Sequence, residues 1–89
     1  MTFTTEFSKE LTRKMSKIQK KNKVMFDAVI KKIKEIKENP EHYKPLRYDM
    51  KGHRRVHIMK SFVLVFKIDY TNNKIIFVDF DHHDKIYLR

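Results

Sequence analysis

The chain of 89 residues has no cysteine, one glycine and only two prolines. Without cysteine, disulfide bridges and zinc sites with cysteine ligands are excluded. No stretch approaches the roughly 18 consecutive apolar residues that a membrane-spanning helix requires, and the N-terminal residues lack the apolar core of a secretion signal. We therefore expect one soluble, cytoplasmic domain over residues 1–89, with a modest core and no membrane association.

Positive charge is abundant and unevenly distributed. The formal net charge is +10, from 21 basic and 11 acidic side chains. Residues 1–60 contain 17 basic and 7 acidic side chains, whereas residues 61–89 contain four of each. Nucleic acid, an anionic membrane or an acidic protein would suit such a surface, and charge alone does not choose among them. A solvated, lysine-rich surface without any partner is the alternative.

The first part of the chain is predicted to form a helical hairpin. An apolar stripe with helical spacing runs through residues 5–20 and consists of Phe7, Leu11, Met15 and Ile18. Thr4 or Thr5 is expected to cap this helix. A second helix is expected over residues 22–38 and ends before Pro40, because the residue that precedes a proline disfavours helical geometry. The short connection predicts antiparallel packing of the two helices.

The second part of the chain changes to the two-residue period of strands. Strands are expected over residues 54–59, 62–68 and 75–80, with a turn at Asn72-Asn73 and a further short strand over residues 47–50. Helices followed by an antiparallel meander of three to four strands indicate an α+β fold. The hairpin should cover one face of the sheet and leave the other face open.

Alternation along the first of these strands separates its side chains into two sets. Val56 and Ile58 are apolar and should face the helices, together with Arg54. Arg55 and His57 would then lie on the open face.

Histidines and cations of the second half have the properties that RNA cleavage requires. Attack by the 2′-hydroxyl on its own phosphodiester needs a base, an acid and positive charge at the phosphate oxygens. Histidine suits the first two roles because its pKa is about 6.5, and arginine or lysine suits the third. The candidate side chains are His57, His82, His83, Tyr87, Arg54, Arg55, Lys44, Arg47 and Lys51.

Structural alternatives exist for the same side chains. His82 and His83 could be ordinary polar residues at a strand end, and Tyr87 could be a packing aromatic. His53 and His57 lie four residues apart, but in a strand this spacing does not bring both rings to one zinc ion. We therefore expect neither a metal nor another cofactor.

Three segments are similar to segments of a known family: residues 45–58, 61–68 and 80–87. They resemble the RelE/ParE toxin superfamily, and the similarity extends over residues 5–88. Its members have a helical hairpin packed on a curved antiparallel sheet, which agrees with the order predicted from periodicity. Their first strand usually precedes the first helix. In this chain only residues 1–4 remain for it, so we expect it to be very short or absent.

Within the superfamily the chain is most similar to the YafQ-like mRNA interferases, which are ribosome-dependent endonucleases. The resemblance implies that His57, His83 and Tyr87 occupy active-site positions of that branch, with His83 as the principal catalytic histidine. Two positions depart from its pattern. Lys44 stands where the branch has a histidine, and Ser61 stands where it has an aspartate.

The resulting hypothesis is a toxin of a type II toxin–antitoxin system that cleaves mRNA on the ribosome without a metal. Its expected catalytic residues are His83, His57, Tyr87 and Arg54, and its expected phosphate-binding residues are Lys44, Arg47, Lys51, Arg55 and His82. The implied partners are mRNA, ribosomal RNA and a RelB-like antitoxin in a hetero-oligomer. The alternatives are a ParE-like, non-catalytic inhibitor of DNA gyrase and a non-toxic, basic nucleic-acid-binding module.

Overall fold

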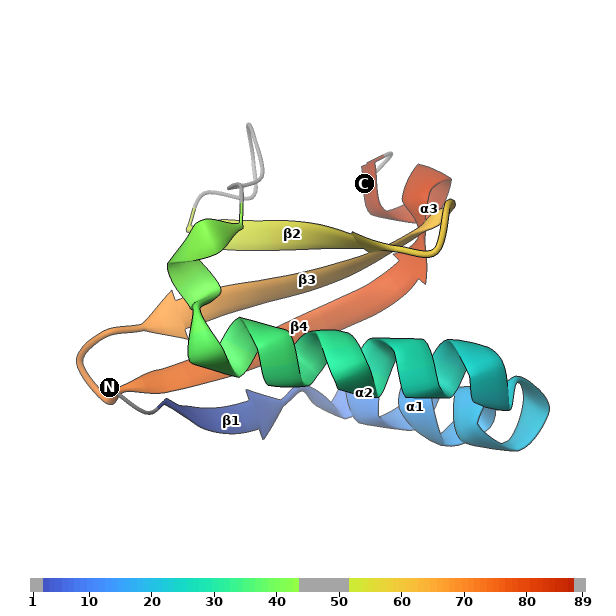
Figure 1. Cartoon of the computed structure of the whole chain (residues 1–89), viewed down its shortest axis with the longest axis horizontal. Helices are drawn as coiled ribbons and strands as arrows, with labels where there is room; N and C mark the ends of the chain where they lie inside the picture. The colour runs from blue at the N-terminus through green and yellow to red at the C-terminus, as the bar shows by residue number, and fades with distance from the viewer. Residues whose placement is uncertain (1–2, 44–51, 88–89) are drawn as a thin grey trace.

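The computed structural model describes residues 3–43 and 52–87, except for the side chain of Tyr87. Its elements, in chain order, are β1 (Thr4–Phe7), α1 (Lys9–Lys21), α2 (Lys23–Glu38), the 3₁₀ turn η1 (Pro40–His42), β2 (His53–Ile58), β3 (Phe62–Asp69), β4 (Lys74–His82) and α3 (His83–Tyr87) (Figure 1). The predicted α+β class and the helical hairpin are confirmed. The strand predicted over residues 47–50 lies outside the described residues.

The start of the chain differs from the prediction that the first helix begins near residue 5. Residues Thr4–Phe7 instead form β1, which runs parallel to β4 and pairs Phe7 with Phe77. The sheet is therefore mixed, whereas we predicted an antiparallel one. Phe7 belongs to this strand, where its ring stacks on Phe77 at 5.3 Å between centroids, and not to the helical stripe.

Ser8 takes the capping role that the sequence assigned to Thr4 or Thr5. Its Oγ accepts a hydrogen bond from the backbone N–H of Leu11 at 3.0 Å, which satisfies a donor at the open end of α1. The same Oγ donates to the carbonyl oxygen of Val78 at 2.6 Å. One hydroxyl thus caps the helix and joins its first turn to β4. At the other end, Asn22 accepts from the N–H of Met25 and caps α2 as the next helix begins.

The four strands are ordered β1-β4-β3-β2, with antiparallel pairing of β2 with β3 and of β3 with β4. The three strands predicted after residue 52 are confirmed within two residues at each end. Leu64 lies opposite Phe80, but Phe66 lies opposite Phe77, so β4 contains one additional residue between these pairs. This bulge allows both Phe77 and Phe80 to enter the same core although their spacing is odd.

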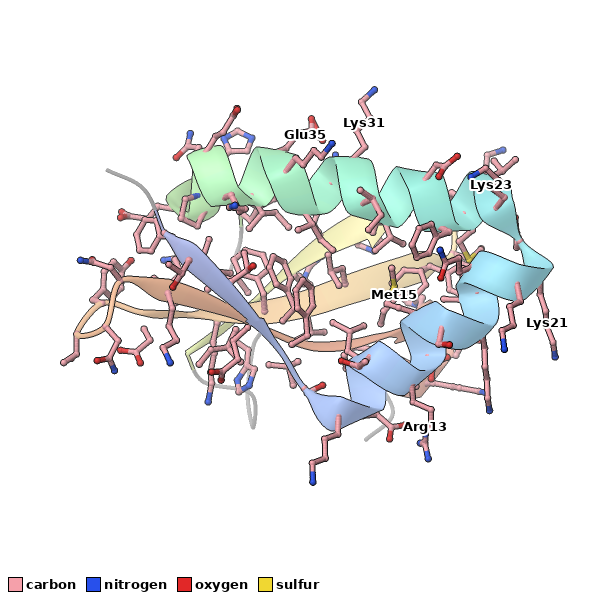
Figure 2. All side chains as sticks on the ribbon, turned by 90° about the horizontal axis from the view of Figure 1, so that it is seen from below. Arg13, Met15, Lys21, Lys23, Lys31 and Glu35 are labelled. Atoms are coloured by element: carbon pink, nitrogen blue, oxygen red, sulfur yellow. The ribbon has the colours of Figure 1, made fainter. Side chains whose placement is uncertain are left out.

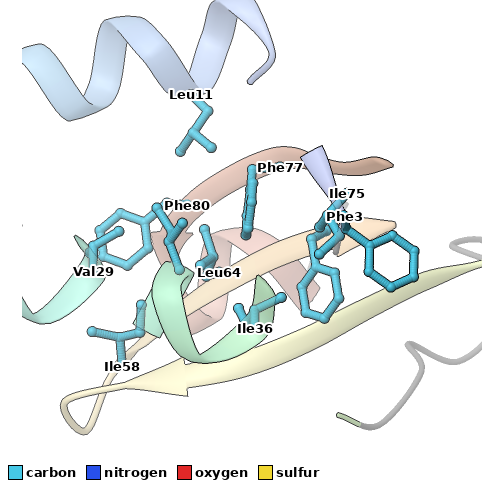
Figure 3. Packing of buried hydrophobic residues seen from close by; sticks show 11 residues of the cluster. Phe3, Leu11, Val29, Ile36, Ile58, Leu64, Ile75, Phe77 and Phe80 are labelled. Carbon is cyan, nitrogen blue, oxygen red and sulfur yellow. The ribbon is translucent and has the colours of Figure 1, made fainter. Parts of the chain in front are cut away.

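The main core lies between the helical hairpin and one face of the sheet (Figure 3). Its fully buried side chains include Leu11, Val29, Ile36, Leu64, Phe66, Ile75 and Phe77. Each such burial contributes roughly 1.5–3 kcal/mol to folding. The core positions the C-terminal ends of β2 and β4, which lie next to the candidate histidines.

The opposite face of the sheet is only partly open, in contrast to the prediction. A second buried cluster consists of Val63, Val65 and Ile86, with Val78 packed against it. Ile86 belongs to α3, a helix of one turn and a half that the sequence did not predict. The helix folds back over the beginning of β3, so it fixes the chain immediately after His82.

A buried ionic cluster joins α1 to β4. The ammonium group of Lys14 lies 2.7 Å from Oδ1 of Asp79 and 2.8 Å from Oδ2 of Asp81. Partial burial alone would lower the pKa of Lys14, but the hydrogen bonds that Lys14 donates to both carboxylates outweigh this effect and raise the pKa above 10.5. Burial would raise the pKa of Asp81, but the bonds from Lys14 and the His82 N–H hold it below 3.8. The folded protein therefore favours the charged form of both groups.

Replacement of Lys14 by alanine is expected to lower the free energy of unfolding by about 2–3 kcal/mol, because Asp79 is only 3% exposed and loses its cation. Urea unfolding at neutral pH measures this change. Lys20→Ala is the matched control: it removes an exposed lysine from the same helix and should cost less than about 0.5 kcal/mol. Equal losses in the two variants would show that the cluster contributes nothing.

Candidate active site

His57 and His83 lie side by side although they are far apart in the sequence. His57 is near the end of β2, and His83 is the first residue of α3. Their ring centroids are 5.9 Å apart and their planes form an angle of 27°. Both rings are exposed, so a ligand in solution can reach them. The structure thus brings together the two histidines to which the resemblance gave active-site positions.

The turn between β2 and β3 holds His83 in place. Met59 begins this turn in the left-handed region, with φ at 58°, and the chain then returns as β3. The carbonyl oxygen of Ser61 then accepts a hydrogen bond from the backbone N–H of His83 at 2.6 Å. One turn later in α3, buried Ile86 packs on Val63. His83 is therefore fixed by the backbone on one side and by apolar packing on the other.

His57 is poised to accept a proton. Loss of hydration lowers the pKa of His57 below the ordinary value of 6.5, and the positive charges of Arg55 and His83 lower it further. The ring is therefore neutral at pH 7, the form that a general base requires. Arg55 lies two residues earlier in β2, so it projects from the same face of the sheet.

Asp84 distinguishes the two consecutive histidines. Its backbone N–H donates to Nδ1 of His82 at 3.2 Å, so this nitrogen carries no proton in that contact. Its carboxylate lies 3.4 Å from Nδ1 of His83, which favours a proton on Nδ1 and leaves Nε2 to react. His82 also packs edge-on against Phe62, at 5.6 Å between centroids. The Asp84 carboxylate is thus nearer to Nδ1 of His83 than to Nδ1 of His82, from which it lies 3.8 Å away.

The sequence did not single out Asp84, although it follows the two histidines directly. A carboxylate next to a histidine is common on any surface, and its usefulness depends on the helical turn of α3. The carboxylate beside the histidines is visible in the sequence, but its contact with the His83 ring is evident only in the folded chain.

Arg54 lies apart from the histidine pair. Its guanidinium group donates to the carbonyl oxygens of Tyr43 at 2.8 Å and Glu41 at 3.4 Å, on the side of the sheet that the helices cover. This placement follows from strand alternation, which groups Arg54 with the core residue Ile58. The observed contacts join β2 to the segment after α2.

The remaining predicted residues fall partly outside the described ranges. These are Lys44, Arg47, Lys51 and the side chain of Tyr87, whose backbone belongs to α3. Within residues 3–43 and 52–87, no three histidine or acidic side chains are grouped so that they could hold a metal ion. None of the helices in these ranges combines the length and the apolar character needed to cross a membrane.

Comparison with known proteins identifies the family. A sequence model described as "ParE toxin of type II toxin-antitoxin system, parDE" matches residues 2–87. The chain belongs to this toxin family. A protein of Methanocaldococcus jannaschii named "Putative toxin RelE4" is 50% identical over 82 residues, which are 92% of this chain and 87% of that protein. The resemblance to the RelE/ParE toxins is thereby confirmed.

Solved structures agree on the fold of this toxin. The YoeB/ParE toxin from Agrobacterium tumefaciens superimposes with a TM-score of 0.83 at 15% identity, covering 91% of this chain and 99% of the other. A crystal structure of the E. coli DinJ-YafQ toxin-antitoxin complex gives a TM-score of 0.78 at 17% identity, covering 98% of this chain and 99% of the other. At these identities the comparison establishes the architecture alone.

Substitution of a cation beside His57 is expected to raise the pKa of that histidine. His83→Ala and Arg55→Gln each remove positive charge that opposes protonation of the toxin's His57. The proton resonances of the His57 ring, followed by NMR across pH 4–9, report this pKa. Lys67→Gln removes a charge at the opposite end of the β2–β3 pair and should leave it unchanged. A His57 pKa that moves in neither test variant would contradict the described electrostatics.

Proposed function

We propose that this toxin is a metal-independent endoribonuclease that cleaves mRNA on the ribosome, with residues 1–89 acting as one toxin domain. The observation that carries the proposal is the stacking of His57 and His83 at 5.9 Å, which allows both rings to reach one phosphodiester. A neutral histidine beside a second histidine and an arginine supplies the base, the acid and the charge that the reaction needs.

The geometry favours a definite division of roles. Neutral His57 removes the proton from a 2′-hydroxyl, and the resulting oxygen attacks the adjacent phosphorus. Protonated His83 donates a proton from Nε2 to the departing 5′-oxygen, while the Asp84 carboxylate faces its Nδ1. Arg55 stabilises the negative oxygens of the transition state. The bond to the 5′-oxygen breaks, and the products are a 2′,3′-cyclic phosphate and a 5′-hydroxyl.

Other cations would hold the RNA. Lys44, Arg47, Lys51 and His82 are proposed to bind phosphates, and Tyr87 is proposed to orient the scissile nucleotide. The excess of basic residues in the first 60 positions supports contacts between the helices and ribosomal RNA. Such contacts are independent of sequence and weaken as salt concentration rises.

The natural partner is proposed to be a RelB-like antitoxin, in a hetero-oligomer that covers the histidine pair. This proposal is supported by the solved relatives, which include the DinJ-YafQ and YoeB-YefM complexes. An acidic or amphipathic segment would suit the net charge of +10. Activity on translating ribosomes would place the toxin in the cytoplasm.

His83→Ala is expected to reduce mRNA cleavage at least about 100-fold, because the leaving oxygen loses its proton donor. Toeprinting of an mRNA in a cell-free translation reaction, with and without ribosomes, measures the activity. His57→Gln should cause a similar loss, whereas His42→Ala, an exposed histidine in η1, is the control and should retain full activity. Cleavage by His83→Ala at the wild-type rate would overturn its assignment, and no cleavage by the wild type would overturn the endonuclease proposal.

The ParE name of the matching family model favours inhibition of DNA gyrase as a second candidate. ParE-like toxins act without chemistry, so His57 and His83 would then be dispensable. A gyrase supercoiling assay without ribosomes separates the two functions. We expect no inhibition of supercoiling, and we expect growth arrest on expression that depends on His83. Arrest that is unaffected by both histidine substitutions, together with blocked supercoiling, would favour the gyrase alternative. Harmless expression would favour a non-toxic binding module.

A further inference from the structure

A hollow of about 260 Å³ lies between α2 and the edge strand β2. Its lining consists of Ala28, Lys31, Lys32 and Glu35 from α2 and of His57, Ile58 and Met59 from the end of β2 and the turn that follows. Figure 2 shows that Lys31 and Glu35 project from the side of α2 that faces away from α1. His57 lines this α2–β2 hollow and also belongs to the histidine pair, so the hollow and the pair adjoin at this residue.

The charges of the hollow favour an anion. Lys32 is paired with Glu35 at 3.2 Å, so these two charges largely offset each other. Lys31 is exposed and makes no ion pair with any of the residues that the structure describes. One lysine is therefore available beside His57, on a helix and not on a loop. An ammonium group in this position can bind a phosphate oxygen.

The floor of the hollow is apolar and offers a different kind of contact. It contains Ala28 and buried Ile58, and Met59 lies at its edge with 56% of its surface exposed. Met59 is the first residue of the turn after β2, and its polarisable sulfur packs well on flat rings. The ammonium group of Lys31 can bind a phosphate, and the adjoining apolar surface can contact a nucleobase. The two together match the parts of a nucleotide.

The size of the hollow limits the ligand. Sites for small molecules usually span about 300–1,000 Å³, so this one suits a single nucleotide unit and not a folded partner. A nucleotide of a single RNA strand is such a unit, and its neighbour in the strand would lie against the histidines.

We propose that the α2–β2 hollow binds the nucleotide next to the cleaved phosphodiester, with Lys31 on its phosphate and Met59 against its base. This inference rests on the proposed function, since it takes the histidine pair as the place of cleavage. The inference adds a nucleotide-binding site beside the proposed catalytic site and places part of it on α2. Without this site, α2 would contact RNA only through its scattered basic side chains.

The first test compares Lys31→Ala with Lys34→Ala, which removes an exposed lysine of the same helix that does not line the hollow. Fluorescence anisotropy measures the affinity of the full chain for a short single-stranded RNA that carries 2′-O-methyl groups throughout, so that no 2′-hydroxyl can attack and no cleavage occurs. Lys31→Ala should weaken binding about tenfold, as expected for loss of a hydrogen bond to a charged group. Its slope of log affinity against log salt should be about 0.7 shallower.

Equal affinities and equal salt slopes for the two lysine variants would overturn the proposal. This outcome is distinct from failure of the endonuclease proposal, because binding is measured without ribosomes and without cleavage. A tenfold loss confined to Lys31→Ala supports the site even if toeprinting shows no cleavage, in which case the chemistry alone fails.

The second test follows the Met59 methyl group by NMR during titration with adenosine 5′-monophosphate, adenosine or inorganic phosphate. The nucleotide should shift this resonance at lower concentration than either fragment, because only the nucleotide reaches both Lys31 and Met59. A glutamate-rich peptide is the competing probe. A shift with the peptide and none with the nucleotide would overturn the proposal and indicate a protein occupant.

Discussion

The hydrogen bond from the His83 N–H to the Ser61 carbonyl oxygen is the contact on which the site depends. It ends β4, begins α3 and sets the distance between the histidine rings. Ile86 reinforces it by packing on the far side of the sheet. The bond uses the backbone of Ser61, so it does not depend on the side chain at this position.

Charged residues of this protein divide into those whose donors are directed into the fold and those that lie near His57. Lys14 and Arg54 both direct their donors inward, toward carboxylates of β4 and carbonyls after α2 respectively. Arg55 follows Arg54 in β2 and Lys31 belongs to α2, and both lie near His57. A net charge of +10 thus gives little information until each cation's partner is known.

Periodicity predicted α2 and the strands after residue 52 because each has a strong local pattern, whereas β1 and α3 escaped prediction. β1 has four residues and exists through pairing with β4, which lies at the other end of the chain. α3 has five residues, too few for a helix to be stable without Ile86 in its cluster. Alternation placed His57 correctly, but its meeting with His83 came from the resemblance. The hollow beside Lys31 had no local signal, because α2 and β2 approach only in the folded chain.

The crowding of positive charge around His57 has a consequence for the proposed cleavage reaction. Without substrate, Arg55 and His83 make protonation of His57 unfavourable, so the base is free to act. A phosphodiester that enters the site brings negative charge to the same place and offsets the charge of Arg55. In the proposed reaction the proton affinity of His57 rises as substrate binds, when His57 takes a proton from the 2′-hydroxyl. Arg55 and His83 keep the base neutral in solution, and the negative charge of the bound phosphodiester offsets their effect in the complex.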